Sequence, residues 1–216
     1  MTDSPMNRIL SFCNGCQQDT NHKIVANCSR QRREGDGQFP QIIDEQWQML
    51  QCCGCGSIKA FVKEDSTDFK NPREIHYPAR QIRKMPKWCG QTSAQCQDLI
   101  REVYMAMHSD CMTLSAMGTR SLLDIMLKDM LGDIGSFQKK LQEAVKQGFF
   151  TNVQKDTIHA AVDAGSAASH RGFRPTESQL SAVLDIVEHA LMGHYVLAAS
   201  SGRLKNEVPP RGSRGG

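Results

Sequence analysis

Apolar residues recur at helical spacing through the second half of the chain. Three stripes carry this period: Leu99, Val103 and Met107; Leu122, Ile125, Met126 and Met130; and Leu180, Val183, Leu184, Val187 and Leu191. Thr92, Thr151 and Thr176 are each followed three residues later by glutamine, a pattern typical of the capping box that begins a helix. The pattern predicts amphipathic helices near residues 93–108, 110–132, 136–147, 152–164 and 177–199, which pack as a bundle.

The first third of the chain carries short strand-like runs instead. Ser57–Val62 alternates in side-chain character, and Lys23–Ala26 and Trp47–Gln51 are two further runs. Residues 29–40 are polar and contain glycine, which predicts a loop. The expected fold class is therefore mainly α, with a small β zinc ribbon at the N-terminus followed by a five-helix bundle.

Composition shifts divide the chain into four segments. We expect a ribbon domain over residues 1–63 and a basic linker over 64–91, where Pro72, Pro78 and Pro86 exclude a long helix. The helical domain follows over residues 92–200. The last segment, residues 201–216, ends in Pro-Pro-Arg-Gly-Ser-Arg-Gly-Gly and is expected to be disordered.

Charge and cysteine content narrow the class of protein. The net charge of +3 over 216 residues indicates no particular partner. The first residues lack the basic-then-apolar order of a signal peptide, and no apolar run approaches the roughly 18 residues that span a bilayer. We therefore expect a cytoplasmic protein without a membrane partner. In a reducing compartment, nine cysteines indicate metal ligation or buried thiols instead of a disulfide framework.

Two Cys-x-x-Cys pairs carry the strongest chemical signal in the sequence. Cys13 and Cys16 form the first pair, Cys52 and Cys55 the second, and glycine lies within or after each turn. Zinc prefers four tetrahedral ligands, and thiolate is one that it favours. The spacing predicts one structural zinc ion bound by these four cysteines. Incidental thiols or a redox pair are the alternatives, as is replacement of one ligand by Cys53 or His22.

Three ordered stretches resemble the bacterial family named domain of unknown function 4145. The first joins the two cysteine pairs through Trp47-Gln-Met-Leu-Gln-Cys52. The second is Gly118-Thr-Arg-Ser-Leu-Leu-Asp124, and the third runs from Phe137 to Gly148 and then from Ala164 to His170. The resemblance implies a zinc ribbon joined to a HEPN-like helical domain. It also implies an association with restriction and other bacterial defence systems.

Several HEPN-type domains are metal-independent ribonucleases in which a histidine serves as general acid or base. The resemblance implies that His170 is the candidate for that role in this chain. Their arginine and histidine are separated by four to six intervening residues, and at those positions before His170 this chain has Asp163, Ala164 and Gly165. The sequence therefore favours a non-catalytic zinc-containing adaptor, and the resemblance implies a role in bacterial defence against foreign nucleic acid. A ribonuclease that uses His170 with an arginine brought close by folding, and a structural protein-interaction subunit, are the alternatives.

Basic residues outside the helices indicate where a partner would bind. Arg30, Arg32 and Arg33 in the expected loop, with Arg80, Arg83 and Lys84 of the linker, predict a surface for non-specific nucleic-acid binding, against the alternative of solvated charge. Arg120 and Asp124 are four residues apart and predict a polar pair on one helix face. We also expect a protein partner from a defence or restriction system, and a homodimer through the helical domain.

Overall fold

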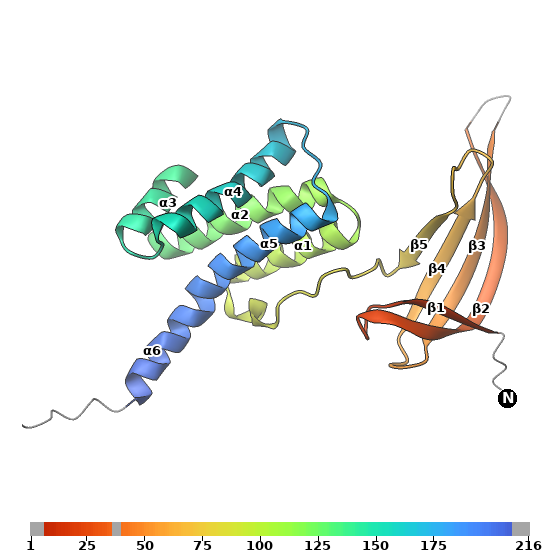
Figure 1. Ribbon diagram of the computed structural model, residues 1–216, viewed down its shortest axis with the longest axis horizontal. Helices are drawn as coiled ribbons and strands as arrows, with labels where there is room; N and C mark the ends of the chain where they lie inside the picture. The colour runs from red at the N-terminus through yellow and green to blue at the C-terminus, as the bar shows by residue number, and fades with distance from the viewer. Residues whose placement is uncertain (1–6, 36–39, 209–216) are drawn as a thin grey trace, which may run out of the picture. The chain divides into compact units, whose positions relative to one another are not determined.

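A computed structural model describes residues 7–35 and 40–208 of the chain. The chain divides into two compact units, Met1–Ile82 and Arg83–Gly216. The first unit consists of β-strands and the second of helices, as Figure 1 shows. We call them the sheet unit and the helical unit, and describe each by itself.

The sheet unit is a five-stranded antiparallel meander in the order β1-β2-β3-β4-β5 (Figure 1). Its strands are β1 (Arg8–Cys13), β2 (Gln18–Glu34), β3 (Gln41–Cys52), β4 (Ile58–Asp65) and β5 (Arg73–Tyr77). A bulge between Ile24 and Ala26 shifts the register of β2 against β3. Because every connection is a hairpin, the β1–β2 and β3–β4 turns lie at the same end of the sheet.

This sheet corrects the fold class expected from the sequence, which was mainly α with a small ribbon. A loop was predicted over residues 29–40, but residues 29–34 continue strand β2 and pair with residues 41–46 of β3. Ala26–Gln31 is exposed on both sides, so its side chains show no alternation that would have identified a strand. The segment expected to be a linker, residues 64–91, contributes β5 to the sheet.

Residues opposed on neighbouring strands share one face of a sheet, and on one of the two faces three such rows cross β2 to β5. They are Ala26, Met49, Ala60 and Tyr77; then Cys28, Trp47, Val62 and Ile75; then Arg30, Glu45, Glu64 and Arg73. We call the first two rows the aromatic face, because the Trp47 and Tyr77 rings stack on it with centroids 5.9 Å apart. The third row places opposite charges side by side.

Five helices pack in the helical unit and a sixth continues the last of them. They are α1 (Ala94–His108), α2 (Met112–Leu131), α3 (Phe137–Lys146), α4 (Asn152–His170), α5 (Glu177–Met192) and α6 (Ala198–Glu207). A π-helical turn, η3 (Gly193–Leu197), joins α5 to α6, and a short 3₁₀ helix, η2 (Lys87–Gln91), precedes α1. Helix therefore continues through residues 201–207, which were expected to be disordered. The remainder of that predicted tail, residues 209–216, lies outside the described residues.

Helix capping follows the sequence at two of the three predicted positions. Thr151 and Thr176 form complete capping boxes with Gln154 and Gln179. Thr92 does not cap α1, which begins after Ser93; its hydroxyl instead donates to the carbonyl of Cys89. Thr92 ends the preceding 3₁₀ helix, so α1 begins one residue later than the threonine–glutamine spacing predicted.

Two glycines allow the helices of the bundle to approach closely. A Cβ atom on Gly118 of α2 would lie 2.4 Å from Cγ2 of Val103 in α1. One on Gly165 of α4 would lie 2.7 Å from the carbonyl oxygen of Ala116 in α2. Because backbone atoms cannot move aside as a side chain can, the Gly165 position fixes the α2–α4 distance.

One continuous helix, Glu177–Glu207, is long and apolar enough to cross a membrane by length and composition. This differs from the absence of such a run expected from the sequence. Its first half packs Leu180, Leu184 and Leu191 into the bundle. The core helix of a bundle meets the same length and composition criteria, so the finding by itself assigns no membrane span.

Candidate metal centre

The two hairpin turns at one end of the sheet bring the four predicted cysteines together. Cys13 ends β1 and Cys52 ends β3, while Cys16 and Cys55 lie in the turns that follow. All four sulfur atoms lie within 4.8 Å of one another. They form the one cluster of potential metal-binding side chains found within residues 7–35 and 40–208.

The distances between sulfur atoms fit a tetrahedral ion. Sγ of Cys13 lies 3.5 Å from that of Cys55, and Sγ of Cys16 lies 3.8 Å from that of Cys52. A tetrahedron with Zn–S bonds of roughly 2.3 Å has sulfur–sulfur edges of roughly 3.8 Å. A disulfide would need a separation of roughly 2.0 Å. The four cysteines therefore suit one metal ion better than two disulfides.

Both turns share one backbone conformation. The amide of Gln17 donates to the carbonyl of Cys13 at 2.7 Å, and that of Gly56 donates to the carbonyl of Cys52 at 3.0 Å. The residue after each second cysteine is left-handed, with φ of +57° at Gln17 and +76° at Gly56. Glycine adopts this conformation readily, whereas glutamine is strained in it. The turn geometry therefore repeats although the sequence does not.

Donors around the sulfur atoms favour thiolates. The amide of Gly54 and the hydroxyl of Thr20 each lie 3.3 Å from Sγ of Cys52, and the Thr20 bond foremost lowers the pKa of Cys52 to about 5. The Ser57 hydroxyl, 3.1 Å from Sγ of Cys55, lowers the pKa of that thiol. Such contacts orient metal-binding side chains and support the charge on them.

The Cys16 sulfur shows why the cluster needs a cation. The pKa of Cys16 is raised to about 12, foremost by its hydrogen bond with Cys55 and then by burial. Without an ion, the four sulfurs therefore cannot all lose their protons. A divalent cation reverses this balance, because a coordinating thiol is deprotonated outright. The donors present fit a soft cation such as Zn²⁺.

The alternative ligands considered from the sequence lie outside the cluster. Cys53 is exposed, and His22 is buried with Nδ1 2.9 Å from the carbonyl oxygen of Thr20. His22 thus lies buried in the same strand, β2, that places Thr20 beside Cys52. Four protein sulfurs complete a tetrahedral shell and leave no position for a reactive water, which is the arrangement of structural zinc sites.

The three arginines of the expected loop lie in strand β2, and two of them pair with carboxylates. Arg30 donates to Glu45 at 2.6 Å, and Arg32 donates to Glu45 at 2.8 Å and to Glu64 at 3.2 Å. Glu45 is only 2% exposed, and its bond with Arg30, joined by one from Trp47, lowers its pKa to about 2. Arg33 is exposed at the end of β2. Arg30 and Arg32 therefore stabilise the charged row of the sheet.

The predicted linker residues divide between the two units. Arg80 belongs to the sheet unit, where its guanidinium lies 4.3 Å from the ring centroid of Phe12. Arg83 and the exposed Lys84 belong to the helical unit. The six predicted basic residues therefore belong to two separately described units, and the surface for nucleic acid stays a prediction.

Arg83 is anchored within the helical unit. It donates to Glu188 at 2.9 Å, to Asp185 at 2.7 Å and to the Ser181 hydroxyl at 2.8 Å, all on α5. Burial opposes its charge, but the bonds with Glu188 and Asp185 raise the pKa of Arg83 above its usual value. This arginine fastens the start of the helical unit to α5, a role that its place in a basic segment did not indicate.

The predicted polar residues of α2 bind other helices. Arg120 donates to the Ser166 hydroxyl of α4 at 2.9 Å, and Asp124 pairs with the buried Lys140 of α3 at 2.9 Å. Among the described ion pairs, Arg120 and Asp124 are not partners of each other. His170 is the exposed last residue of α4, one helical turn after Ser166.

Comparisons with known proteins bear on the helical unit alone. No curated protein and no solved structure matches the chain. A family model covers just under half of the chain, from within α1 to the end of α6, and none of the sheet unit. Residues 101–207 thus match the family described as domain of unknown function (DUF4145), which supports the family resemblance drawn from the sequence.

Proposed function

We propose that this chain is a non-catalytic binding protein, an adaptor whose sheet unit is held in shape by one structural zinc ion. The closed arrangement of four sulfurs carries the proposal, since it supplies ligands for an ion but no open coordination position. The ion then acts on the fold alone: it joins the β1–β2 turn to the β3–β4 turn. Function lies in the surface that this fold presents.

The aromatic face is the surface that best fits a partner. A groove of about 400 Å³ crosses it, lined by apolar side chains that include Trp47, Met49 and Ala60. Met49 and Tyr77 are 46% and 51% exposed beside it. Aromatic and methionine side chains are enriched at protein interfaces, and contiguous exposed apolar surface marks sites of interaction.

The charges of the sheet favour a protein over nucleic acid as the partner. Phosphate binding needs cationic groups that are not already neutralised. Arg30 and Arg32 face Glu45 and Glu64 within the sheet. The association with bacterial defence, and with foreign nucleic acid, rests on the family resemblance. In that setting, the chain joins a partner protein to a defence assembly.

Affinity capture from the native host tests this function. Immobilised zinc-loaded protein is exposed to lysate with and without nuclease, and Met49→Glu is compared with Leu10→Glu, an equally drastic change on exposed β1. We expect a protein that is retained despite nuclease, lost by Met49→Glu and kept by Leu10→Glu. A partner lost upon nuclease treatment would assign the chain to nucleic acid. Equal capture by both variants would remove the aromatic face from the account.

One observation favours a second function, a HEPN-type ribonuclease. The sequence lacks an arginine shortly before His170, but α2 supplies Arg120, whose guanidinium bonds Ser166 at 2.9 Å. Ser166 and His170 are four residues apart in α4 and therefore lie on the same helix face. A cation and an imidazole one turn apart have the chemistry to stabilise phosphate charge and move a proton.

The ribonuclease alternative predicts RNA cleavage that depends on both residues. Labelled structured and unstructured RNA is incubated with the wild type, His170→Ala, Arg120→Lys and the control His159→Ala, an exposed histidine of the same helix. Cleavage lost in the first two variants and kept in the third would replace the adaptor function by catalysis. The adaptor function predicts no cleavage above the level of His170→Ala.

A further inference from the structure

Strand β2 is longer than the strand that pairs with its outer side. β1 covers β2 only as far as Lys23, and the side-chain amide of Asn7 donates to the carbonyl of Ile24 at 2.9 Å. β2 then continues to Glu34, paired with β3 alone (Figure 1). In the described part of the chain, no strand pairs with the outer side of residues 25–34, which we call the β2 edge.

An open strand edge presents main-chain hydrogen-bonding groups in a fixed order. At every second residue, both the N–H and the C=O point out of the sheet toward the place of a neighbouring strand. Proteins usually protect such edges with proline, with charged side chains or by keeping the strand short. The β2 edge contains no proline, and two of its arginines, Arg30 and Arg32, are bonded to Glu45 over the face of the sheet. The β2 edge is therefore complementary to the backbone of an extended chain.

The opposite edge of the sheet does not share these properties. β5 spans only Arg73–Tyr77 and is flanked by Pro72 and Pro78. Proline has no N–H to donate, so it interrupts strand pairing at both ends of β5. An added strand could therefore form a longer ladder at the β2 edge than at β5.

The β2 edge borders the groove of the aromatic face. Ala26, Asn27 and Cys28 belong to the edge and also line this groove, together with Trp47 and Met49 of β3. Neighbouring strands lie roughly 4.8 Å apart, and opposed side chains on the same face of a sheet contact each other. A strand added at the β2 edge therefore directs the side chain opposite Cys28 toward the apolar groove.

The far end of the β2 edge favours an acidic residue. Arg33 is exposed, and among the described residues it has no ion-pair partner. Across the strand it opposes Ile42, which carries no charge. Opposite charges that face each other on neighbouring strands attract. Because Cys28 and Arg33 are five residues apart, they face opposite sides of the sheet, and the residues opposite them in an added strand are also five positions apart.

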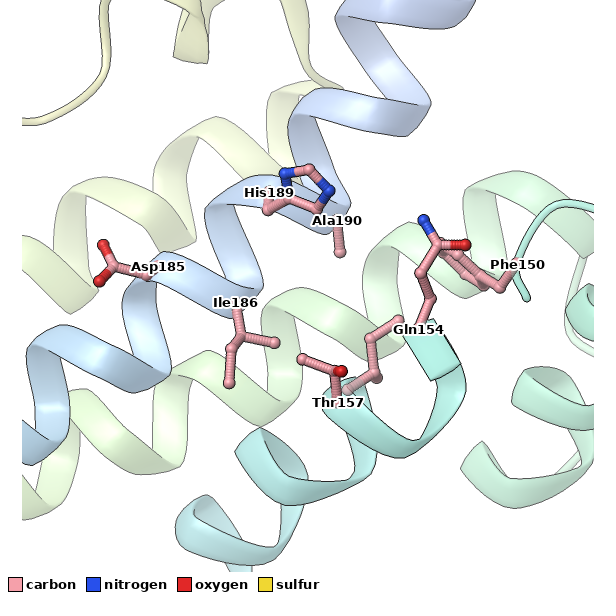
Figure 2. Close-up of a pocket in the computed structure, with 8 residues that line it drawn as sticks. Phe150, Gln154, Thr157, Asp185, Ile186, His189 and Ala190 are labelled. Carbon is pink, nitrogen blue, oxygen red and sulfur yellow. The ribbon is translucent and has the colours of Figure 1, made fainter. Parts of the chain in front are cut away.

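The helical unit has an apolar groove of similar volume but no open edge. This groove, of about 460 Å³, lies between α4 and α5, and Figure 2 shows Ile186 and Ala190 of α5 and Gln154 and Thr157 of α4 in its lining. Helices satisfy their own backbone hydrogen bonds except at their ends, so these walls offer only side-chain contacts. The α4–α5 groove therefore provides a control surface for binding of an extended chain.

We propose that the partner of the adaptor binds as an extended strand, which adds to the β2 edge as a sixth strand of the sheet. Its backbone pairs with the β2 edge, a large apolar side chain enters the groove beside Cys28, and an acidic side chain faces Arg33. This inference rests on the proposed adaptor function and names the chemistry of its partner. A second copy of this chain is the competing occupant, because two open edges can also pair with each other.

Peptide selection on the immobilised, zinc-loaded full chain tests this chemistry. The probe is a phage-displayed library of random peptides of about 12 residues, long enough to pair along the β2 edge. We expect enriched peptides to carry a large apolar residue and an acidic residue five positions apart. Each enriched peptide is then synthesised in two forms, N-methylated at the odd or at the even positions. Because strand pairing uses every second N–H, one form should bind at least about tenfold more weakly and the other should keep its affinity.

Protein variants test the two side-chain contacts. Arg33→Glu should weaken the enriched peptides about two- to fivefold, and peptides with lysine in place of the acidic residue should restore binding. Met49→Glu should weaken them through the groove. Lys70→Glu, an exposed charge reversal before β5, and Ile186→Glu, in the α4–α5 groove, should change neither contact. Circular dichroism melts establish that each variant is folded.

The outcomes separate the added strand from the adaptor function. Absence of enriched peptides, or an equal response to both N-methylated forms, would overturn the added strand. If Met49→Glu still abolished capture of the host partner, the adaptor function would stand without it. Host capture that Met49→Glu leaves unchanged would remove the adaptor function instead. Hydrogen exchange that is slowed in residues 25–34 only as protein concentration rises would assign the β2 edge to a second copy and overturn the proposal.

Discussion

The two units of this chain reach a stable fold by different means. Among the described residues, the sheet unit buries only five apolar side chains, and Cys13 and Cys52 are two of them. The helical unit buries Leu, Met, Val and Ile side chains from five helices. Gly118 and Gly165 allow these helices to pack closely. With the proposed zinc site, a small core is supplemented by a metal ion, whereas a bundle of this size needs only burial. Changes in one unit should therefore leave the other folded.

Loss of one zinc ligand should have the largest effect. Cys52→Ser should release the ion and unfold the sheet unit, because binding of a structural zinc ion contributes on the order of 10 kcal/mol to folding. The helical unit should keep its own thermal transition. Zinc content and far-ultraviolet circular dichroism measure the two effects separately.

Two other cysteines provide the controls for this change. Cys28→Ser and Cys53→Ser alter exposed thiols outside the cluster and should leave zinc content and melting unchanged. Zinc retained by Cys52→Ser but lost by Cys53→Ser would show that Cys53 is the true ligand. That exchange would contradict the sulfur geometry on which the closed site rests.

A substitution that loosens the helical unit should have the second largest effect on stability. Gly165→Ala places a Cβ atom 2.7 Å from the backbone oxygen of Ala116, so α2 and α4 must separate. We expect destabilisation of about 1–3 kcal/mol and a helical transition several degrees lower, with zinc content unchanged. Gly202→Ala, in open space on α6, is the matched control and should stabilise slightly. Equal effects at both glycines would show that close packing is not the cause.

A smaller loss is expected from the charged row of the sheet. Glu45→Gln removes the carboxylate that Arg30 and Arg32 share and should destabilise the sheet unit by about 1–2 kcal/mol at pH 7. Since the folded-state pKa of Glu45 is lowered from 4.5 to about 2, its contribution is fully present above pH 4.5 and is lost as pH falls through about 2. Urea denaturation of zinc-loaded protein measures the difference. An unchanged midpoint would indicate that solvent screens the pair.

The smallest effect should be a gain. Gln17 has φ of +57° at the position where the second turn has Gly56. Gln17→Gly should relieve that strain and stabilise the sheet unit by about 0.5 kcal/mol, after the loss of chain entropy that glycine brings. Gly56→Gln should do the opposite. A destabilised Gln17→Gly would mean that the side-chain bond from Gln17 to the Asn14 carbonyl, at 2.7 Å, outweighs the strain.

Local spacing predicted what depends on local geometry. The Cys-x-x-Cys pairs predicted the cluster of four sulfurs, because each turn by itself places two of them close together. The capping boxes at Thr151 and Thr176 located two helix starts. The long β2–β3 hairpin was missed, since the exposed part of β2 has no buried side to produce alternation. The strand-like run at Trp47–Gln51 located the end of β3, but the preceding residues 44–46 are all polar and gave no alternation that would have extended it.

Residues whose partners are distant in sequence could not be assigned from the sequence alone. Arg83 looked like part of a basic linker until α5 placed Glu188 and Asp185 around it. Arg120 was paired with Asp124 by their spacing of four, yet packing at Gly165 brings Ser166 to it instead. In each case the charge could be read from the sequence but the tertiary contact could not.

The central claim is that one zinc ion holds the sheet unit and not the helical unit. Hydrogen exchange by mass spectrometry, with and without a chelator, tests it on protein whose metal content is measured beforehand. We predict about one zinc per chain, loss of protection in residues 8–77 upon chelation, and unchanged protection in residues 94–192. Absence of bound zinc, or equal loss of protection in both units, would contradict the account.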